Sequence, residues 1–414
     1  MSHDIVIVGA GAAGLATAIF AGRLTRASIR VVDSAARPGA KILVSGGSRC
    51  NVTNAVVSER DYWGGRRTII KRVLSRLPVP ETITFFDEIG IPLKQEPTEK
   101  LFPRTDRSRD VLDALLDAAR AADVTISPGI RVQNVRPDST GFVIESSAGP
   151  IHAACVVMAT GGLSLPKTGS DGAGLEIARG LGHSLVATTP ALAPLILHDG
   201  FHERLSGVAQ DVELALRVDG RITERIAGAM LWTHFGVSGP AALDMSRHVL
   251  RARVEGGDPR VTVSFGRGAT FDSVDATLAR MSTRRPRVNL QSALAELVPA
   301  SVAAALLGYA DVDGATRLGS LSREMRRSVT HALTDLPLHV VDSRGYNYAE
   351  ATAGGVALDE IDPASMESRR CPGLYLVGEM LDVDGRLGGF NFQWAWSSGR
   401  AAAEGLATRF GGRG

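Results

Sequence analysis

The 414-residue sequence predicts an α/β protein whose first and last segments fold together, with a region of different hydrophobic patterning between them. Three observations carry this prediction. A short β-branched run near the N-terminus is followed by spaced glycines and then by a helical pattern. A second strand pattern, glycine turn and amphipathic segment lie in the C-terminal region. Between them, alternating strand patterns give way to helical spacing, which indicates a separate insert.

Composition and charge restrict the class of protein. The chain is 44% hydrophobic and 22% charged, as globular proteins are. Its net charge of +2 gives no electrostatic reason to expect nucleic acid as the main partner. No apolar run reaches the roughly 20 residues that span a bilayer, so no membrane association is expected. Three scattered cysteines argue against a disulfide scaffold or a zinc site, and we expect a cytoplasmic protein.

The N-terminal unit begins with a predicted strand at residues 5–8. Gly9, Gly11 and Gly14 follow in G-x-G-x-x-G spacing, then "LATAIFAGRL" as a helix and "ASIRVVDSA" as a second strand that reaches Asp33. Gly9 would make the turn, Gly11 would let a pyrophosphate approach the backbone, and Gly14 would permit close packing of helix on strand. Asp33 would accept hydrogen bonds from an adenosine ribose and disfavours a 2′-phosphate, so the unit predicts bound FAD or NAD.

The C-terminal segment favours FAD over NAD. A strand over Leu374–Val377 leads into Gly378-Glu379, and a glycine turn at Gly388-Gly389 precedes a long amphipathic segment. FAD is long, and a second segment of chain is typically needed to reach its flavin end. We expect Glu379 to bond the ribityl chain or its phosphate. The glycine turn would aim backbone N–H groups at the flavin N1–O2 edge, where negative charge appears on reduction.

Two further features narrow the class of flavoprotein. The stretch "AACVVMATGG" predicts a strand followed by Thr160-Gly161, typical of a chain that crosses beneath bound FAD, and the backbone at Val132 is a candidate adenine contact. No second G-x-G-x-x-G occurs, so a nicotinamide donor would visit the flavin only transiently. Cys50 has no partner cysteine within ten residues, which argues against a thiol–disulfide relay.

Five long motifs, in order along the chain, resemble those of the BaiN-like (YhiN-type) FAD-dependent oxidoreductases. They are "GAKILVSGGSRCNVTN", "FPRTDRSRDVLDAL", "LPKTGSDGAGLEIARGLGHSLVATTPALAPL", "LWTHFGVSGPAAL" and "TAGGVALDEIDPASMESRRCPGLYLVGEMLDVDGRLGGFNFQWAWSSG". The resemblance implies a Rossmann-like, two-segment FAD-binding domain with an inserted β-barrel-like plus helical region. It also implies flavin-mediated redox chemistry on an organic substrate, in particular reduction of a C=C bond. Ala40 and Phe390 replace the usual arginine and tyrosine, so we assign no phosphate contact to the first and no proton transfer to the second.

The stretch at residues 39–54 is predicted to be a flavin cradle. Lys41 and Arg49 would supply positive charge, and the residues from Ser45 to Asn51 would supply hydrogen-bond donors. A solvated basic loop is the alternative. The candidate cofactor-binding residues are Gly9, Gly11, Ala13, Gly14, Asp33, Lys41, Ser45, Gly46, Arg49, Cys50, Asn51, Val132, Thr160, Gly161, Gly378, Glu379, Gly388, Gly389, Asn391 and Phe392.

The predicted domain boundaries follow the change of texture. The first FAD-binding segment covers residues 1–190, the insert 191–341 (strand-rich at 191–268, helical at 269–336), and the second FAD-binding segment 342–414. In the insert, "DVELALRVDGRITERI" predicts a hairpin around Asp219-Gly220. Its arginines are interpreted as a solvated helix face, with an anion-binding or partner surface as the alternative. Those arginines are Arg284, Arg285, Arg287, Arg323, Arg326 and Arg327.

The sequence assigns no catalytic residue firmly. Cys50 could pack beside the flavin, tune it or donate a proton, or act as a nucleophile. His234, on a glycine-rich turn, could face the substrate, but a lone histidine is more often structural, as we expect for His183. No Ser/His/Asp order and no metal-binding pattern is present, so hydrolase and metal functions lack support.

The sequence therefore predicts an FAD-dependent oxidoreductase. It would transfer hydride from reduced flavin to an unsaturated, enone-like small molecule, with NAD(P)H as the transient electron donor. Two alternatives are a flavin-dependent tRNA-modification factor and a non-catalytic FAD-bound regulator. The near-neutral charge and the lack of interleaved aromatic and basic residues count against the first alternative. The substrate, the direction of reaction and the oligomeric state are left open.

Overall fold

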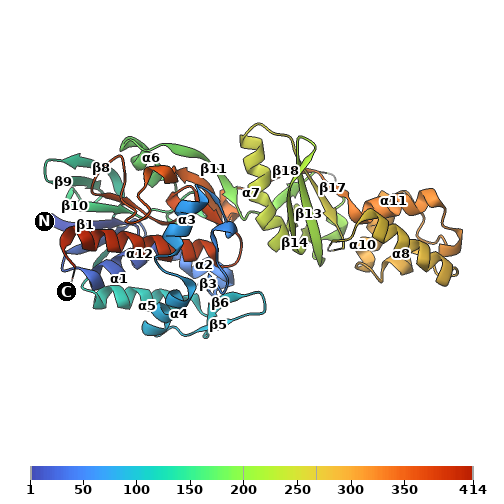
Figure 1. The fold of residues 1–414 in the computed structure, drawn as a ribbon, viewed down its shortest axis with the longest axis horizontal. Helices are drawn as coiled ribbons and strands as arrows, with labels where there is room; N and C mark the ends of the chain where they lie inside the picture. Colours follow the sequence, from blue (N-terminus) through green and yellow to red (C-terminus); the bar gives the residue numbers. More distant parts are fainter. Residues whose placement is uncertain (1, 199, 267, 413–414) are drawn as a thin grey trace. The chain divides into compact units, whose positions relative to one another are not determined.

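The computed structural model describes residues 2–198, 200–266 and 268–412 (Figure 1). The chain forms two compact units, and we treat each by itself. The terminal unit comprises Met1–Thr189 and Ala349–Gly414, and the insert unit comprises Pro190–Tyr348. Among the described residues, no helix combines the length and the apolar character needed to cross a bilayer.

The terminal unit is built on a sheet of strand order β7-β2-β1-β10-β9-β8, with β20 also paired to β10. Strands β1, β2, β7, β10 and β20 are parallel, whereas β8 and β9 join antiparallel. The bounds are β1 Ser2–Val8, β2 Ile29–Asp33, β7 Thr125–Pro128, β8 Val132–Asp138, β9 Gly141–Ser146, β10 Ile151–Met158 and β20 Leu374–Leu376. A strand from the C-terminal segment therefore completes a sheet that the N-terminal segment begins.

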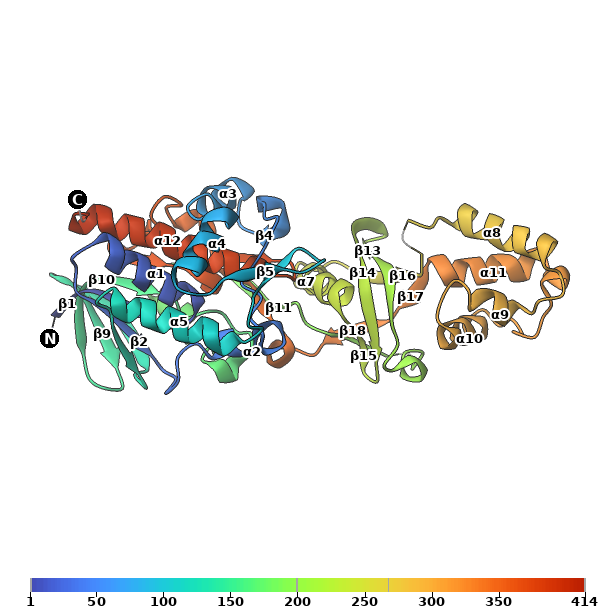
Figure 2. The same cartoon turned by 90° about the horizontal axis from the view of Figure 1, so that it is seen from below.

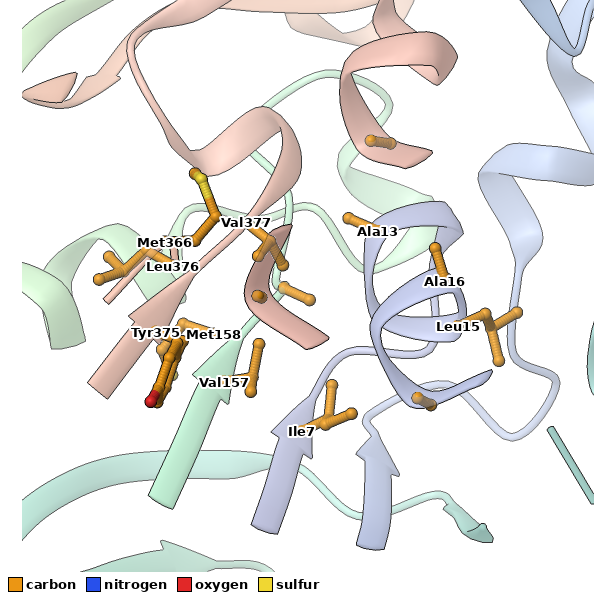
Figure 3. Packing of buried hydrophobic residues seen from close by; sticks show 14 of the residues in the cluster. Ile7, Ala13, Leu15, Ala16, Val157, Met158, Met366, Tyr375, Leu376 and Val377 are labelled. Carbon is orange, nitrogen blue, oxygen red and sulfur yellow. The ribbon is translucent and has the colours of Figure 1, made fainter. Parts of the chain in front are cut away.

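The central strands are apolar on both faces because both faces are covered, as is usual for parallel sheets. Ile7 of β1 pairs with Val157 of β10, which in turn pairs with Tyr375 of β20, and all three are buried. Figure 3 shows these side chains on neighbouring strands, with Ala13 and Ala16 of the first helix close by. The mixed α/β fold predicted from the sequence is confirmed here.

Small residues let two long helices pack closely beside this sheet. Helix α1 (Ala12–Leu24) lies along α12 (Phe390–Phe410), and α5 (Ser108–Ala121) also contacts α1 (Figures 1 and 2). A Cβ on Gly399 of α12 would lie 2.9 Å from the carbonyl oxygen of Ala13. No larger residue fits there, so this glycine sets the distance between helices from opposite ends of the chain.

The remaining elements of the terminal unit surround this core. They form three small sheets, β3-β6-β5, β21-β4 and β11-β19. Their strands are β3 Thr53–Asn54, β4 Tyr62–Gly64, β5 Leu93–Gln95, β6 Lys100–Pro103, β11 Leu185–Ala191, β19 Ala351–Val356 and β21 Val383–Gly385. The helices are α2 Ala40–Ser48, α3 Arg67–Leu74, α4 Val79–Glu88 and α6 Ala173–Gly180, with 3-10 turns η1 Glu59–Asp61, η2 Pro166–Thr168, η6 Leu358–Glu360 and η7 Gly378–Met380; the turn η5 Tyr346–Tyr348 ends the insert unit.

The insert unit has its own sheet, of order β17-β16-β13-β14-β15-β12-β18, and its own buried core. The predicted hairpin is confirmed: β13 and β14 pair around Asp219 and Gly220, which both have positive φ. The strands are β12 Leu195–Leu197, β13 Ala209–Val218, β14 Arg221–Thr233, β15 Gly236–Ser238, β16 Pro259–Ser264, β17 Leu336–Leu338 and β18 Val340–Ser343.

Helices of the insert unit differ from the sequence reading at two places. Helix α7 (Pro240–Val254) lies inside the part expected to be strand-rich, and the stretch from residue 290 to 310 is broken at Pro299. The others are α8 Phe271–Arg284, α9 Leu290–Leu294, α10 Ala300–Tyr309 and α11 Arg323–Thr334, with η3 Glu203–Leu205 and η4 Leu318–Ser320. Their arginines form the expected solvated face: all are exposed except Arg326, which pairs with Asp275.

Candidate functional site

In the turn after β1, Gly9 and Gly14 are required for packing, whereas Gly11 is not. A Cβ on Gly14 would lie 1.9 Å from the carbonyl oxygen of Gly9, and one on Gly9 would lie 2.4 Å from that of Ala159. A Cβ on Gly11, the N-cap of α1, would meet no atom of the described residues within 4 Å. The space beside Gly11 and the N-terminus of α1 is therefore left open, as a bound phosphate group would require.

The acid of β2 lies at this turn. One carboxylate oxygen of Asp33 accepts a hydrogen bond from Ala10 N at 2.6 Å, and the other accepts one from Ala35 N at 2.8 Å. Ile130 N donates to the carbonyl of Asp33 at 2.8 Å, which brings the start of β8, at Val132, to the same edge of the sheet. Asp33, the glycine turn and Val132 are thus neighbours, in the arrangement that the sequence predicts for the adenosine end of a dinucleotide.

Lys41 and Glu379 meet although 338 residues separate them. Lys41 Nζ lies 2.6 Å from Glu379 Oε2 and donates to Ser164 Oγ at 2.7 Å. The second carboxylate oxygen accepts hydrogen bonds from Ser164 Oγ, Thr352 N and Thr352 Oγ1, at 2.7, 3.0 and 2.9 Å. The side chains of Lys41 and Glu379 are 25% and 18% exposed, so this polar cluster is partly open to a ligand.

The stretch predicted to be a flavin cradle forms α2 and a tight turn. Gly46, Gly47, Ser48 and Cys50 all have positive φ, so helical geometry is interrupted from residue 45 onward. Ser45 Oγ donates back to Ile42 O at 2.7 Å. The turn directs residues 50 and 51 into the protein, where both are buried.

Arg49 is engaged by the β5–β6 hairpin. Its guanidinium lies 2.6 Å from Glu96 and 3.7 Å from Asp106, and it covers the ring of Phe102 at 4.0 Å. These carboxylates offset its charge, whereas the sequence suggested that Arg49 would supply positive charge to a cofactor. Its proposed cofactor contact stays a prediction.

The C-terminal turns interlock with the N-terminal segment. A Cβ on Gly378 would lie 2.7 Å from Cβ of Ala13, and one on Gly389 would lie 2.4 Å from the backbone of Thr53. Asn54 Nδ2 donates to the carbonyl of Gly388 at 3.2 Å. Gly388 and Gly389 both have positive φ, so glycine is required for conformation as well as for space.

Four other predicted residues are held mainly by the protein itself. Thr160 lies 4.0 Å from the sulfur of Met380, and a Cβ on Gly161 would lie 2.6 Å from Ser170 Oγ. The Asn391 amide bonds the backbone N–H and C=O of Gly385, and Phe392 stacks on Trp396. Asn391 thus caps the turn before α12.

A family model described as the HI0933-like protein Rossmann domain matches residues 3–405. The chain belongs to the HI0933-like family. It is 32% identical over 407 residues to a 3-dehydro-bile acid delta(4,6)-reductase of Clostridium scindens, which covers 97% of this chain and 99% of the relative. It is also 32% identical over 406 residues to a ribosomal RNA dihydrouridine synthase of Escherichia coli, covering 97% of this chain and 98% of the relative.

Solved structures of low sequence identity share the fold. A 3-ketosteroid delta1-dehydrogenase from Sterolibacterium denitrificans superposes with a TM-score of 0.52 at 14% identity, covering 99% of this chain and 100% of that one. A flavocytochrome c3 fumarate reductase gives 0.51 at 17% identity, covering 98% and 78%. The family match and the full-length reductase relative show that the protein is an FAD-dependent oxidoreductase, and these solved structures share its Rossmann-like fold.

Two observations show that this HI0933-like chain fits FAD. The open space at Gly11 faces a helix N-terminus, which suits a pyrophosphate. In the predicted flavin cradle, Asn51 is 8% exposed, and its Oδ1 is buried without a hydrogen-bond partner among the described residues. An unsatisfied buried acceptor is costly, so a cofactor N–H at Asn51 would account for it.

The candidate catalytic residues lie in different surroundings. Cys50 is buried, and burial raises the pKa of its thiol to about 12. His234 is exposed in the insert unit, edge-on to Phe235 at 5.1 Å. His183 is structural, as expected: both ring nitrogens are bonded, to Glu360 at 2.9 Å and Ser368 at 2.8 Å. Within the described ranges, no group of His, Cys, Asp and Glu could hold a metal ion.

Sequence reasoning missed three residues of the site. Ser164 and Thr352 fix the Glu379 carboxylate, and Lys100 lies beside Gly388. Thr352 opens one of the five family-like motifs, which was the available signal for it. Ser164 and Lys100 have no local pattern that distinguishes them, since their positions follow from pairing between distant strands and turns.

Proposed function

We propose that the protein uses bound FAD to reduce a C=C bond conjugated to a carbonyl group, with NAD(P)H as the electron donor. The observation that carries the proposal is a row of groups in the terminal unit that suit a dinucleotide cofactor. The row starts with Asp33 and the open space at Gly11, includes the Lys41–Glu379 cluster, and ends with the turn at Gly388. Groups from both ends of the chain build it, as an elongated cofactor requires.

The names of the two full-length relatives support this reaction class. One is a reductase of delta(4,6) double bonds in a 3-dehydro bile acid, and the other is a dihydrouridine synthase. The 4,6-diene of a 3-oxo steroid and the C5=C6 bond of uracil are both conjugated to a carbonyl group. A hydride acceptor of this kind is the chemistry that the two names share, although the substrates differ greatly in size.

The residues of this chain would bind and orient the cofactor. Asp33 would accept hydrogen bonds from the ribose, and the N-terminus of α1 at Gly11 would face the pyrophosphate. The Lys41–Glu379 cluster would contact the ribityl chain or its phosphate, and the turn at Gly388 would face the flavin. FAD supplies the redox chemistry when bound: it accepts a hydride from the nicotinamide and delivers one to the substrate.

The experiment begins with the protein as purified. Heating should release a yellow supernatant that contains one FAD per chain, and anaerobic NADH or NADPH should bleach the bound flavin. Mixing the reduced protein with a 3-oxo-4,6-diene bile acid, or separately with unmodified ribosomal RNA, should restore the oxidised spectrum. The product should gain two hydrogens by mass. A protein that binds no FAD on reconstitution, or whose reduced flavin neither substrate class reoxidises anaerobically, would contradict the proposal.

A further inference from the structure

Lys100 lies beside the turn that precedes α12, and no carboxylate of the described residues pairs with it. It is half-buried on β6, and the strand register places it opposite Asn54 of β3. Its Cε lies 3.4 Å from the position that a Cβ on Gly388 would take. Asn54, its cross-strand neighbour, donates to the carbonyl of that same glycine. Lys100 is therefore tied by position to the turn at Gly388-Gly389.

Two neighbouring cations are paired, whereas Lys100 has no ion pair with any residue that the structure describes. Lys94 pairs with Asp106, and Arg49 pairs with Glu96. No ion pair or side-chain hydrogen bond joins Lys100 to another described residue. Glu99 is its immediate neighbour in sequence and is exposed. Glu96 and Asp106 thus offset the charges of Arg49 and Lys94, and the ammonium of Lys100 has no side-chain partner within the described part of the chain.

Two further groups indicate that a ligand meets the protein here. Val52 N donates to Leu101 O at 2.9 Å, so Asn51, with its unsatisfied buried Oδ1, lies next to the strand that carries Lys100. Helix α12 begins at Phe390, directly after the turn, and adds the partial positive charge of its N-terminus. The ammonium of Lys100 and the N-terminus of α12 suit a ring that becomes negatively charged. The unsatisfied Oδ1 of Asn51 suits an N–H on the same ring.

We propose that Lys100 is a cofactor-tuning residue that stabilises the reduced form of the flavin. The inference rests on the proposed position of FAD in the terminal unit. Hydride transfer adds two electrons and one proton to the flavin, at N5, and leaves one negative charge on the N1–O2 edge. The ammonium of Lys100 would offset that charge, so the protein would bind reduced FAD more tightly than it would without Lys100, and the bound flavin would accept hydride from NAD(P)H more readily.

Spectroelectrochemistry of the FAD-loaded protein tests this inference directly. Lys100→Met should lower the affinity for reduced FAD relative to oxidised FAD by about tenfold or more, which is a potential about 30 mV more negative for a two-electron couple. Lys100→Arg should keep most of the wild-type value. Lys94→Met is the matched control: it removes a lysine from the same hairpin, but one already paired with Asp106, and should leave the potential unchanged.

Sulfite provides a second readout that needs no substrate. It adds to flavin N5 and leaves a negative charge at N1, so Lys100→Met should weaken sulfite binding by a similar factor. If Lys100→Met retains too little FAD to measure, Lys100→Gln supplies a neutral side chain of similar length. A Lys100 variant that binds FAD fully and keeps both the potential and the sulfite affinity overturns the inference and leaves the proposed function standing. A wild-type protein without FAD overturns both.

Discussion

Cys50 has the surroundings of a packed residue and not of a reactive one. It is fully buried at a left-handed backbone position, and the pKa of its thiol is raised to about 12. Such a thiol is protonated at neutral pH, whereas the nucleophilic form is the thiolate. Of the three roles open from the sequence, the structure therefore disfavours nucleophilic catalysis.

The first prediction concerns this residue. Cys50→Ala should keep the rate of carbonyl-conjugated C=C reduction within about threefold of wild type, because a thiol whose pKa is raised to about 12 is neither a thiolate nor a ready proton donor at neutral pH. The rate is measured as NAD(P)H consumption, with FAD content determined for each preparation. A variant that is folded and loaded with FAD but has lost activity a hundredfold would restore Cys50 as a catalytic residue.

His183 is buried and held between two partners. The Nδ1–H donates to the Glu360 carboxylate, and Nε2 accepts the hydroxyl proton of Ser368. Burial, together with the nearby Arg370 guanidinium, lowers the pKa of His183, although the Glu360 carboxylate raises it. Burial would raise the pKa of Glu360, but the N–H of Ser184 and the guanidinium of Arg370 outweigh it and hold that pKa at about 2.

Both shifts make the protein less stable in acid. As pH falls below about 6.5, the unfolded chain protonates His183 before the folded protein does, and Glu360 behaves in the same way from pH 4.5 to about 2. The free energy of unfolding should therefore fall between pH 7 and pH 5, by at most about 1.4 kcal/mol per pH unit for one histidine. Urea titrations at several pH values measure it.

The control for this second prediction is another histidine. His183→Asn should make the pH dependence between pH 7 and pH 5 shallower, because one titrating group is gone, whereas His248 of the insert unit, whose pKa burial lowers to about 3, still contributes to the slope. His152→Asn removes a histidine whose side chain is 50% exposed and should leave the slope as in wild type. Equal slopes for His183→Asn and wild type would show that His183 does not cause the acid sensitivity.

At the scale of elements, the β1–α1 turn allows a matched pair of substitutions. Gly14→Ala would place a Cβ 1.9 Å from a backbone oxygen, so the helix must move off the strand. We expect a loss of about 3 kcal/mol or more in unfolding free energy, or failure to fold. Gly11→Ala meets no protein atom within 4 Å and should cost little stability, yet its methyl group would occupy the space assigned to the pyrophosphate.

The two readouts of this third prediction are independent. Thermal unfolding of the FAD-free protein reports the fold, and titration with FAD reports the site. Gly11→Ala should unfold within a few degrees of wild type and bind FAD at least about tenfold more weakly. Normal FAD affinity in Gly11→Ala would mean that no phosphate lies against that glycine.

Local patterns predicted the elements whose residues are contiguous in sequence. The strand before Gly9, helix α1, the strand reaching Asp33 and the β13–β14 hairpin all follow from periodicity and turn chemistry. Helix α7 was missed because its sequence follows a strand-rich stretch without a break in composition. The interruption between α9, which ends at Leu294, and α10, whose N-cap is Pro299, shows the opposite error, because helical spacing continued across the interruption.

Contacts between distant segments could not be predicted in the same way. The sequence placed Lys41 and Glu379 at one cofactor but gave no sign that they pair, because 338 residues separate them. Likewise, the sequence suggested that the charge of Arg49 would be available to a cofactor, whereas Glu96 and Asp106 pair with Arg49. Such pairings depend on which turns the sheet topology brings together, and no local pattern records that.

At the scale of the whole molecule, the insert unit has the features of an independent domain. Its core is separate from that of the terminal unit, and its entry and exit strands pair, with Leu195 opposite Ser343. Arg344 N also donates to Pro194 O at 2.9 Å, so the two ends of the insert lie side by side. A segment with its own core and adjacent ends is suited to folding alone.

The fourth prediction follows from this arrangement. A fragment of residues 190–348 should unfold in urea with one cooperative transition, and its amide NMR spectrum should be dispersed. Replacing residues 193–345 in the full chain by a short glycine–serine loop should leave a protein that still binds FAD. A fragment with the spectrum of an unfolded chain would show that the insert depends on the terminal unit for its fold.

The pairing of α1 with α12 has a consequence for how the protein is made. Helix α1 leaves the ribosome early, but Gly399, which lets α12 lie against it, is added only after the entire insert has been translated. A nascent chain can therefore fold the insert before α12 is available to pack on α1. Until then the first βαβ unit is exposed to chaperones and proteases. Chains that terminate before α12 would be unable to retain FAD. The yellow colour of bound flavin would therefore mark chains whose translation had finished.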